Sequence, residues 1–295
     1  MSQPASGTPA PAVYGTSERA PRGDYQRNGQ VAADYTCAQN YAAYTASDHE
    51  LYRHLFQRQS ALLPGLACDE FISALQRLGS SQHIPHFEDI NQQLLQATGW
   101  QIVAVPGLIP DVPFFSLLAS RKFPITDWLR KPAEVDYIVE PDIFHELFGH
   151  VPLLFNPVFA DHLQAYGAGG LKADRLGACV ALSRLYWYTI EFGLIQNRGG
   201  LRAYGAGILS SAGELQHAVK SREPQRLWLN LQRAMRTRYR IDSFQKTYFV
   251  IDSFQQLFDM TMPDFTSLYA QLSALDELAD DVRVAEDIGL PPLGG

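Results

Sequence analysis

The chain has 295 residues, enough for one large domain, and its hydrophobic fraction of 46% allows a substantial core. Its net charge of −7 argues against a nucleic-acid-binding groove, because such grooves rely on clustered Lys and Arg. No run approaches the ~20 consecutive apolar residues of a transmembrane helix, and the N-terminus lacks the basic and apolar regions of a signal peptide. We therefore expect a cytoplasmic protein that binds neither nucleic acid nor membranes.

The first half of the chain predicts a tail, three helices and a strand. Residues 1–30 are rich in Ala, Pro, Ser and Gly, a composition typical of disorder. Ser47 and Glu50 have the spacing of a capping box and predict the start of the first helix. Helical apolar spacing followed by glycine predicts two more helices, and a run of β-formers predicts a strand. These elements are expected at residues 69–78, 87–98 and 101–105.

The second half of the chain is predicted to be mostly helical. Segment 114–130 is apolar and aromatic and is expected to form short helices and turns. Pro141 is placed to begin one helix as its first residue, and Asn156 is placed to cap the next. The stretch 173–192, closed by Gly193, is the longest helical candidate. Further helices are expected at 213–220, 225–236, 252–260 and 264–278.

Together these elements predict an α-rich fold, mainly α with small β-sheets. Residues 31–295 are expected to form a single domain, in which a loosely ordered C-terminal tail begins at about residue 283.

Two histidines, His145 and His150, are separated by five positions in the segment that ends at Pro152. Zinc proteases carry their pair at i and i+4, whereas a spacing of five puts the two side chains roughly 140° apart on a regular helix. They converge on one ion only if the helix ends between them, and Gly149 and Pro152 are placed to end it. The pair therefore indicates an ion at the C-terminal edge of a helix.

A carboxylate would complete such a site, because two His and one Asp or Glu form the facial triad of non-haem iron(II) oxygenases. Glu191 is the best third ligand, since it lies in an apolar helix where an unpaired carboxylate is costly to bury. Glu140, Asp142 and Glu146 are rival ligands, and Asp142 is better placed to orient an imidazole. Ordinary core histidines and a pairing of Glu191 with Arg184 are the alternatives, which the residues alone leave open.

The string PDIFHELFGHVPLL at 141–154 resembles the signature of the pterin-dependent aromatic amino acid hydroxylases. Other segments resemble the same family in order and at family-like spacing, and they lie at 84–90, 105–108, 186–193 and 203–214. The resemblance covers roughly residues 46–262. It implies the catalytic-domain fold of this family, a basket of helices with small sheets around a mononuclear iron(II).

The same resemblance implies roles for residues around the metal and the pterin. It assigns the metal ligands, and with them the catalytic centre, to His145, His150 and Glu191. Phe114 matches the aromatic residue that stacks on the pterin ring, and Glu146 matches a carboxylate near the pterin. Tyr186 matches an aromatic residue close to the iron.

On the substrate side, Arg130 matches the arginine that clamps the amino-acid carboxylate, a task that suits a bidentate, always-charged group. Ser210 matches a hydroxyl near the substrate, and Trp187 matches a residue that lines the same pocket. Ile241 falls where phenylalanine enzymes carry an aliphatic residue and tyrosine enzymes an aspartate, which favours phenylalanine. Residues 138–139 are Ile-Val where animal phenylalanine enzymes have Thr-Pro, so the substrate-side wall of the pocket is expected to differ in detail from theirs.

The expected activity is phenylalanine 4-monooxygenation, which converts L-phenylalanine to L-tyrosine with O2 and a tetrahydropterin at a 2-His-1-carboxylate iron(II). The chain resembles the short bacterial enzymes of the family, without the regulatory domain or tetramerising helix of the animal enzymes, and is expected to be a monomer. The alternatives are a tryptophan hydroxylase of the same family, a zinc hydrolase, and a non-catalytic module that binds pterin or iron.

Overall fold

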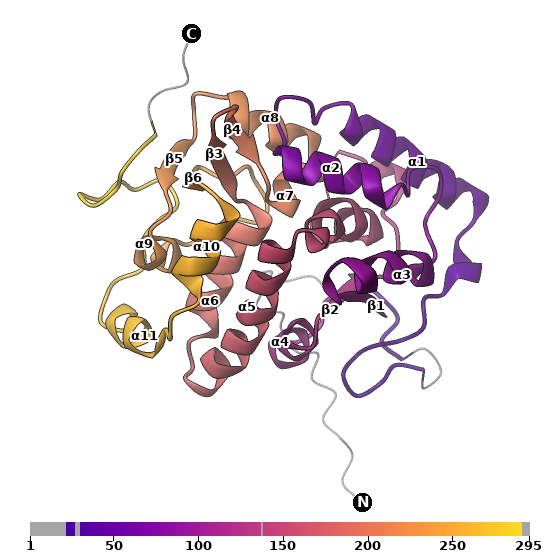
Figure 1. Ribbon diagram of the computed structural model, residues 1–295, viewed down its shortest axis with the longest axis horizontal. Coiled ribbons are helices and arrows are strands. Elements are labelled where there is room, and N and C mark those ends of the chain that lie inside the picture. The colour runs from indigo at the N-terminus through magenta and orange to yellow at the C-terminus, as the bar shows by residue number, and fades with distance from the viewer. Residues whose placement is uncertain (1–21, 27–29, 137, 291–295) are drawn as a thin grey trace, which may run out of the picture.

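The computed structural model describes residues 22–26, 30–136 and 138–290. Helices predominate, with α1–α3 on one side of the molecule, α9–α11 on the opposite side, and α5 and α6 between them (Figure 1). The α-helices are α1 Ala46–Ser60, α2 Asp69–Leu78, α3 Phe87–Thr98, α4 Asp111–Ala119, α5 Pro157–Arg175, α6 Cys179–Tyr186, α7 Ala206–Leu209, α8 Ala212–Lys220, α9 Leu231–Arg236, α10 Phe254–Thr261 and α11 Thr266–Leu272. The strands are β1 Gln101–Val105, β2 Lys122–Thr126, β3 Leu194–Asn197, β4 Gly200–Ala203, β5 Gln225–Trp228 and β6 Thr247–Ile251. The predicted α-rich fold with small sheets is confirmed.

The predictions for α2, α3 and β1 are confirmed at both ends. Each of these helices stops at a glycine in the left-handed region, where φ is 65° for Gly79 and 73° for Gly99. The start of α1 was misplaced, because its capping box is formed by Thr45 and Asp48 and not by Ser47 and Glu50. Thr45 has the extended backbone of an N-cap, and this conformation frees its hydroxyl to accept the Asp48 N–H.

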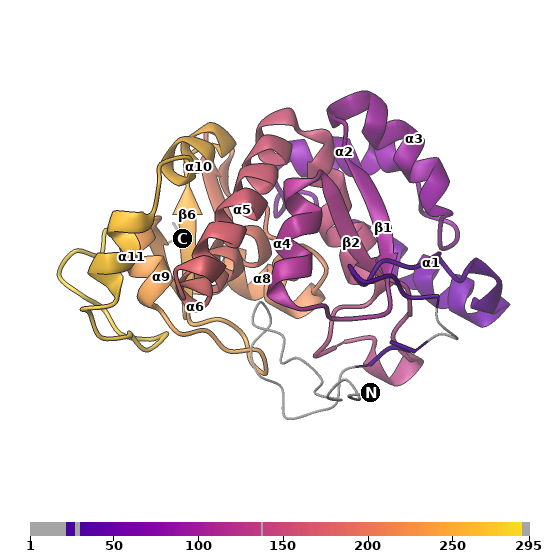
Figure 2. The ribbon, with the colours of Figure 1, turned by 90° about the horizontal axis from the view of Figure 1, so that it is seen from below.

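Segment 114–130 contains a strand that was not predicted. After α4 the chain forms β2, which pairs in parallel with β1 and places Gln101 opposite Lys122. Figure 2 shows α4 beside this two-stranded sheet. Four successive residues of β2 are buried, so β2 lacks the alternation of polar and apolar residues by which a half-exposed strand is recognised.

The longest helix is α5, which Asn156 caps as predicted by accepting the N–H groups of Val158 and Phe159. The predicted continuous helix at 173–192 is wrong. Gly177, with φ of 66°, breaks it into the end of α5 and a second helix, α6, that runs on into a π-helical turn.

The four-stranded sheet has the order β4-β3-β6-β5, with β3 and β4 antiparallel and the other pairs parallel. The predicted helix at 225–236 is therefore wrong in its first part, since 225–228 form the edge strand β5. Only α9 in its second part is helical. The last predicted helix, at 264–278, is reduced to α11.

Residues near both ends of the described chain pack on the rest of the structure. Arg22 lies over the Trp128 ring at 4.2 Å and pairs with Glu134 at 2.8 Å. Asp287 forms a buried ion pair of 2.8 Å with Arg233. The packed chain thus includes residues 22–26 and continues to 290, whereas residues 1–21, 27–29 and 291–295 lie outside the described ranges.

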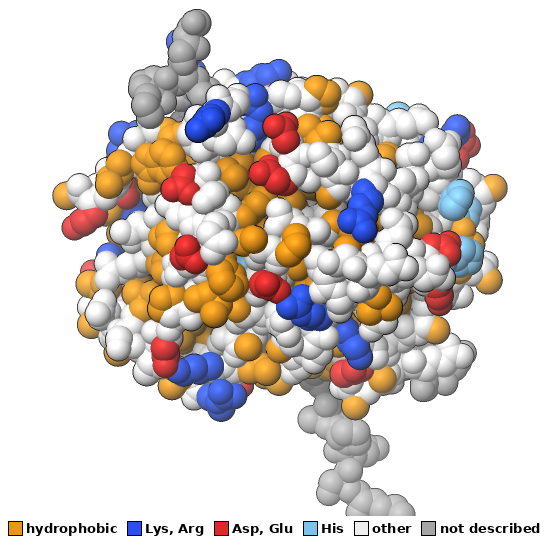
Figure 3. All heavy atoms as spheres, viewed as in Figure 1, with side chains coloured by type: hydrophobic (Ala, Val, Ile, Leu, Met, Phe, Trp, Pro, Cys, Tyr) orange, Lys and Arg blue, Asp and Glu red, His pale blue; other side chains and the backbone are white. Residues whose placement is uncertain are grey.

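Within the described ranges, none of the helices combines the length and the apolar character needed to span a bilayer. On the face seen in Figure 3, hydrophobic side chains are interspersed with single acidic and basic ones.

Candidate metal centre and active site

The two histidines lie on one π-helical turn, His145–His150, in which the N–H of Val151 donates to the carbonyl of Glu146. A hydrogen bond between residues five apart brings such residues nearly one above the other, so both imidazoles face the same side. The prediction that the helix must end between them is wrong, because the helix widens instead. Gly149 allows the turn to approach α7, since a Cβ at that position would lie 2.9 Å from the carbonyl oxygen of Ala206.

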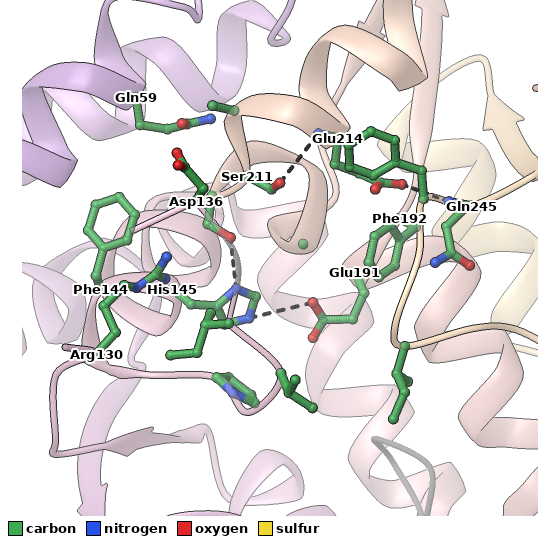
Figure 4. A pocket seen from close by; sticks show the side chains of 18 of the residues that line it. Gln59, Arg130, Asp136, Phe144, His145, Glu191, Phe192, Ser211, Glu214 and Gln245 are labelled. Carbon is green, nitrogen blue, oxygen red and sulfur yellow. Dashed lines mark hydrogen bonds and ion pairs between the residues drawn. The ribbon is translucent and has the colours of Figure 1, made fainter. Parts of the chain in front are cut away.

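Glu191 reaches the same point from a second π-helical turn, Trp187–Glu191. Its carboxylate lies 3.6 Å from Nε2 of His145 (Figure 4). The same carboxylate lies 3.1 Å from Nε2 of His150, and the two imidazole nitrogens are 3.2 Å apart. Ligands about 2.1 Å from one ion lie about 3.0–3.6 Å apart when the angle between them at the ion is about 90–120°. The three buried groups therefore fit one metal ion, and they are the one such cluster in the described part of the chain.

Ser210 sets the protonation of His145. The serine hydroxyl donates its single hydrogen to the carbonyl of Ala206 at 2.8 Å, so it must accept from Nδ1–H of His145, also at 2.8 Å. Nε2 of His145 is then left as a bare acceptor that faces the cluster. Burial holds the pKa of His145 at about 4, which keeps the ring neutral as a metal ligand must be.

Asp142 does not orient an imidazole as expected. Its carboxylate accepts from the backbone N–H of His145 at 3.0 Å and forms a two-pronged ion pair with Arg130, at 2.8 Å from Nε and 2.9 Å from Nη2. Burial acts to raise the pKa of Asp142, but the guanidinium of Arg130 outweighs it and the pKa is lowered. Asp142 thus caps the turn that Pro141 was expected to begin, and it holds Arg130 in place.

One pocket opens beside the cluster, and all four predicted substrate residues, Arg130, Trp187, Ser210 and Ile241, line it. The metal ligands His145 and Glu191 line the same pocket. Arg130 uses Nε and Nη2 for Asp142, whereas its Nη1 has no hydrogen bond among the described residues. That nitrogen is available to an anion in the pocket.

The three predicted pterin residues do not line this pocket. Phe114 meets the ring of Tyr186 edge-on at 5.7 Å, and Tyr186 lies 6.5 Å from the ring of His150. Glu146 is buried with Oε2 3.8 Å from Nε2 of His150. Burial, reinforced by the nearby carboxylates, raises its pKa well above the usual value.

Among the pocket residues that the sequence analysis missed are two buried polar ones, Glu214 and Gln245. Glu214 accepts from the backbone N–H of Gln245 at 3.1 Å and from the hydroxyl of Tyr248. Glu214 lies within a segment of the family resemblance. It is a polar residue in the first turn of a short helix, and such a position gave no reason to expect a buried side chain. Gln245 lies in a loop and carries no local signal.

The comparisons agree with this geometry. Residues 14–274 match the family described as biopterin-dependent aromatic amino acid hydroxylase. The chain belongs to this family. It is 57% identical over 276 residues to phenylalanine-4-hydroxylase of Ralstonia nicotianae, covering 92% of this chain and 88% of the relative. It is 60% identical over 243 residues to phenylalanine-4-hydroxylase of Chromobacterium violaceum, covering 82% of each.

Solved structures of this hydroxylase family share the fold. The crystal structure of phenylalanine hydroxylase from Chromobacterium violaceum bound to cobalt superposes with a TM-score of 0.87 at 56% identity, covering 88% of this chain and 94% of that one. The predicted membership of the pterin-dependent hydroxylases is confirmed, and with it the fold of a hydroxylase catalytic domain.

Proposed function

We propose that this biopterin-dependent hydroxylase is a phenylalanine 4-monooxygenase, which converts L-phenylalanine to L-tyrosine. The observation that carries the proposal is the convergence of His145, His150 and Glu191 at the inner end of a pocket that also presents the guanidinium of Arg130. Relatives that are 57% and 60% identical to this chain bear the name phenylalanine-4-hydroxylase, which supports this substrate.

The donor set suits iron(II), because two imidazoles and one carboxylate leave coordination positions for oxygen. Bound iron and tetrahydropterin supply the redox chemistry that activates O2. The protein contributes the positions of the groups. Ser210 fixes the His145 tautomer, and Asp142 fixes Arg130. The related Chromobacterium enzyme has been crystallised with cobalt, another divalent first-row metal that such a site accepts.

The substrate would be held at both ends. Nη1 of Arg130 would take the amino-acid carboxylate in a charge-assisted hydrogen bond. The aromatic ring would lie against Trp187, Phe192 and Ile241, which line the same pocket as the metal ligand Glu191. An apolar wall accepts phenylalanine without leaving a polar group unpaired, whereas the phenol of tyrosine would require a partner.

For the pterin, Phe114 would provide the stacking ring, with Glu146 and Tyr186 on the same side of the metal site. Their arrangement around His150 supports this assignment. We further propose that the enzyme works as a cytoplasmic monomer without nucleic-acid or membrane partners, in keeping with the net charge of −7. Sedimentation of the purified protein tests the monomer directly.

The deciding experiment measures oxygen-dependent turnover of L-phenylalanine by the purified protein with iron(II) and a tetrahydropterin. Parallel reactions replace iron by zinc, omit the pterin, or offer L-tryptophan. Tyrosine formed only with both iron and pterin supports the reaction, the metal and the cofactor together. Product formed faster from tryptophan would assign the chain to the tryptophan hydroxylases. No hydroxylated product from either amino acid, with iron bound and the fold intact, would count against a hydroxylase, and the zinc-loaded protein would then be assayed on hydrolysable substrates.

A further inference from the structure

Gln245 is a buried loop residue whose polar groups are all engaged. Its Oε1 accepts from the indole Nε1–H of Trp187 at 3.0 Å, and its Nε2 donates to the carbonyl of Arg240 at 2.8 Å. Its backbone N–H donates to Glu214, and its carbonyl lies 3.3 Å from Nε2 of His217. One side chain thus connects the loop before β6 to the π-helical turn that carries the metal ligand Glu191.

Trp187 is held in one orientation by three contacts. Its ring stacks on Tyr239 with centroids 4.2 Å apart and on Phe192 at 4.6 Å, and its N–H is fixed by Gln245. Rotation of the indole would break both stacks and leave a buried N–H without its hydrogen-bond partner, so the observed orientation is favoured. The orientation of Trp187 matters, because this residue lines the pocket four positions before Glu191 on the same turn.

The loop that Gln245 closes forms part of the pocket wall through Arg240, Ile241, Ser243, Phe244 and Gln245. Residues 238–246 form neither helix nor strand, so no ladder of backbone hydrogen bonds fixes their conformation. The bond from the Gln245 amide to the Arg240 carbonyl closes this loop across five residues, and Ile241 lies between them. Ile241 therefore lies in the chain between Tyr239, which stacks on Trp187, and Gln245, which accepts the Trp187 N–H, so both anchors of this segment are on Trp187.

We propose that Gln245 is a positioning and specificity-determining residue for aromatic hydroxylation, which locks the 238–246 loop onto Trp187 and so fixes the wall that receives the substrate ring. This inference rests on the proposed function. The side chain would not touch the reacting atoms; it would set the separation of Trp187 and Ile241. Without it the ring could be bound off-centre, and a misplacement of about 1 Å can slow a reaction by roughly 100-fold. Oxidation of the pterin would then outrun formation of hydroxylated product.

Two substitutions separate the functions of the amide. Gln245→Met has a similar length but removes both the acceptor for Trp187 and the donor to Arg240. Gln245→Glu keeps an acceptor for the indole N–H and loses the donor that closes the loop. Gln255→Met is the matched control, since Gln255 is an exposed glutamine whose amide contacts only Asp259.

Four measurements on each iron-loaded protein report catalysis: kcat, KM for phenylalanine, the tyrosine formed per pterin oxidised, and the preference for phenylalanine over tryptophan. Two more, the iron content and the midpoint of thermal unfolding, report whether the metal site and the fold are intact. For Gln245→Met we expect KM to rise about tenfold, which corresponds to one lost hydrogen bond of about 1.4 kcal/mol. Less tyrosine should form per pterin, the preference for phenylalanine should narrow, and iron content should stay unchanged. Gln245→Glu should show the same changes to a smaller extent, and Gln255→Met none.

A double-mutant cycle with Trp187→Phe tests the link between the two residues. Because this second substitution removes the indole N–H, Gln245→Met should raise KM less in that background than in the wild type. A purely structural role would lower the unfolding midpoint of Gln245→Met and leave KM, tyrosine yield and substrate preference as in the wild type, and that result would overturn the proposal. Should Gln245→Met fail to fold, Gln245→Glu decides by the same readouts.

Failure of the proposed function can be distinguished from failure of the positioning role, because it would show in the wild-type protein as an absence of tyrosine. The affinity of the iron-loaded variants for phenylalanine, measured by calorimetry, then tests the pocket wall formed by Trp187 and Ile241 without requiring turnover. Weaker binding by Gln245→Met than by Gln255→Met would uphold the positioning role, and equal binding would reject it.

Discussion

The buried carboxyl of Glu214 should make the stability of the protein depend on pH in a direction opposite to that of most acidic side chains. Only 5% of Glu214 is exposed, and burial raises its pKa from 4.5 to about 7, although hydrogen bonds from Tyr248 and Gln245 act to lower it. The substitution Glu214→Gln keeps an oxygen that can accept both hydrogen bonds and removes the ionisation.

The magnitude follows from linkage between proton binding and folding. The folded state holds the Glu214 proton up to about pH 7, whereas the unfolded chain releases it near pH 4.5. Between these values the folded state binds more protons, so the free energy of unfolding falls as pH rises. A shift of 7 − 4.5 = 2.5 pKa units, at 1.36 kcal/mol per unit, corresponds to about 3 kcal/mol, fully lost only above pH 7.

The assay is urea unfolding of wild type and Glu214→Gln at pH 5, 6, 7 and 8, with matched metal content. Other titrating groups are common to both proteins and cancel in the difference between their free energies of unfolding. We expect this difference to move in favour of Glu214→Gln by about 2.5 kcal/mol from pH 5 to pH 8. Glu50→Gln, at an exposed position, should show no such trend. A difference that is constant with pH, or that moves toward the wild type, would refute the reasoning.

Three further outcomes are expected. Glu191→Ala should bind iron poorly and form no tyrosine while its circular dichroism stays helical; full activity would exclude Glu191 as a ligand. Arg130→Lys should raise KM for phenylalanine about 10- to 100-fold, because one ammonium cannot serve both Asp142 and a substrate carboxylate; calorimetry of phenylalanine binding checks this. Gly170→Ala should destabilise the α4–α5 contact by about 1–3 kcal/mol, because its Cβ would lie 2.2 Å from the Phe115 ring. Gly169→Ala, with nothing within 4 Å, should instead stabilise α5 by about 0.5–1 kcal/mol, and thermal unfolding compares the pair.

The helices that the sequence predicted well are those whose ends depend on neighbouring residues. Gly79 and Gly99 end α2 and α3 because the left-handed conformation after a helix is a local requirement that glycine meets without strain. The strands β2 and β5 were missed for the opposite reason. Each is four or five residues long, and each is a strand only because a distant segment supplies its hydrogen bonds.

The candidate site was likewise predicted in part from the sequence and in part not. Residue chemistry and spacing, with the family resemblance, were enough to select His145, His150 and Glu191, since two imidazoles and a carboxylate in an apolar setting require a cation. How the first two converge was predicted wrongly. A π-helical turn arises when a backbone hydrogen bond shifts by one residue, and no pattern of side chains announces that shift.

The amino-acid sequence by itself therefore determined the helix-rich class, the glycines that end α2 and α3, the Asn156 cap of α5 and the candidate metal ligands, because these depend on local backbone preferences and on the chemistry of single side chains. Only the tertiary structure decided which strands pair, that Ser210 fixes the tautomer of His145, and that Glu214 and Gln245 are buried beside the pocket. Those facts depend on contacts between residues 31 to 65 positions apart in the chain, whose free energy appears only when both partners are in place.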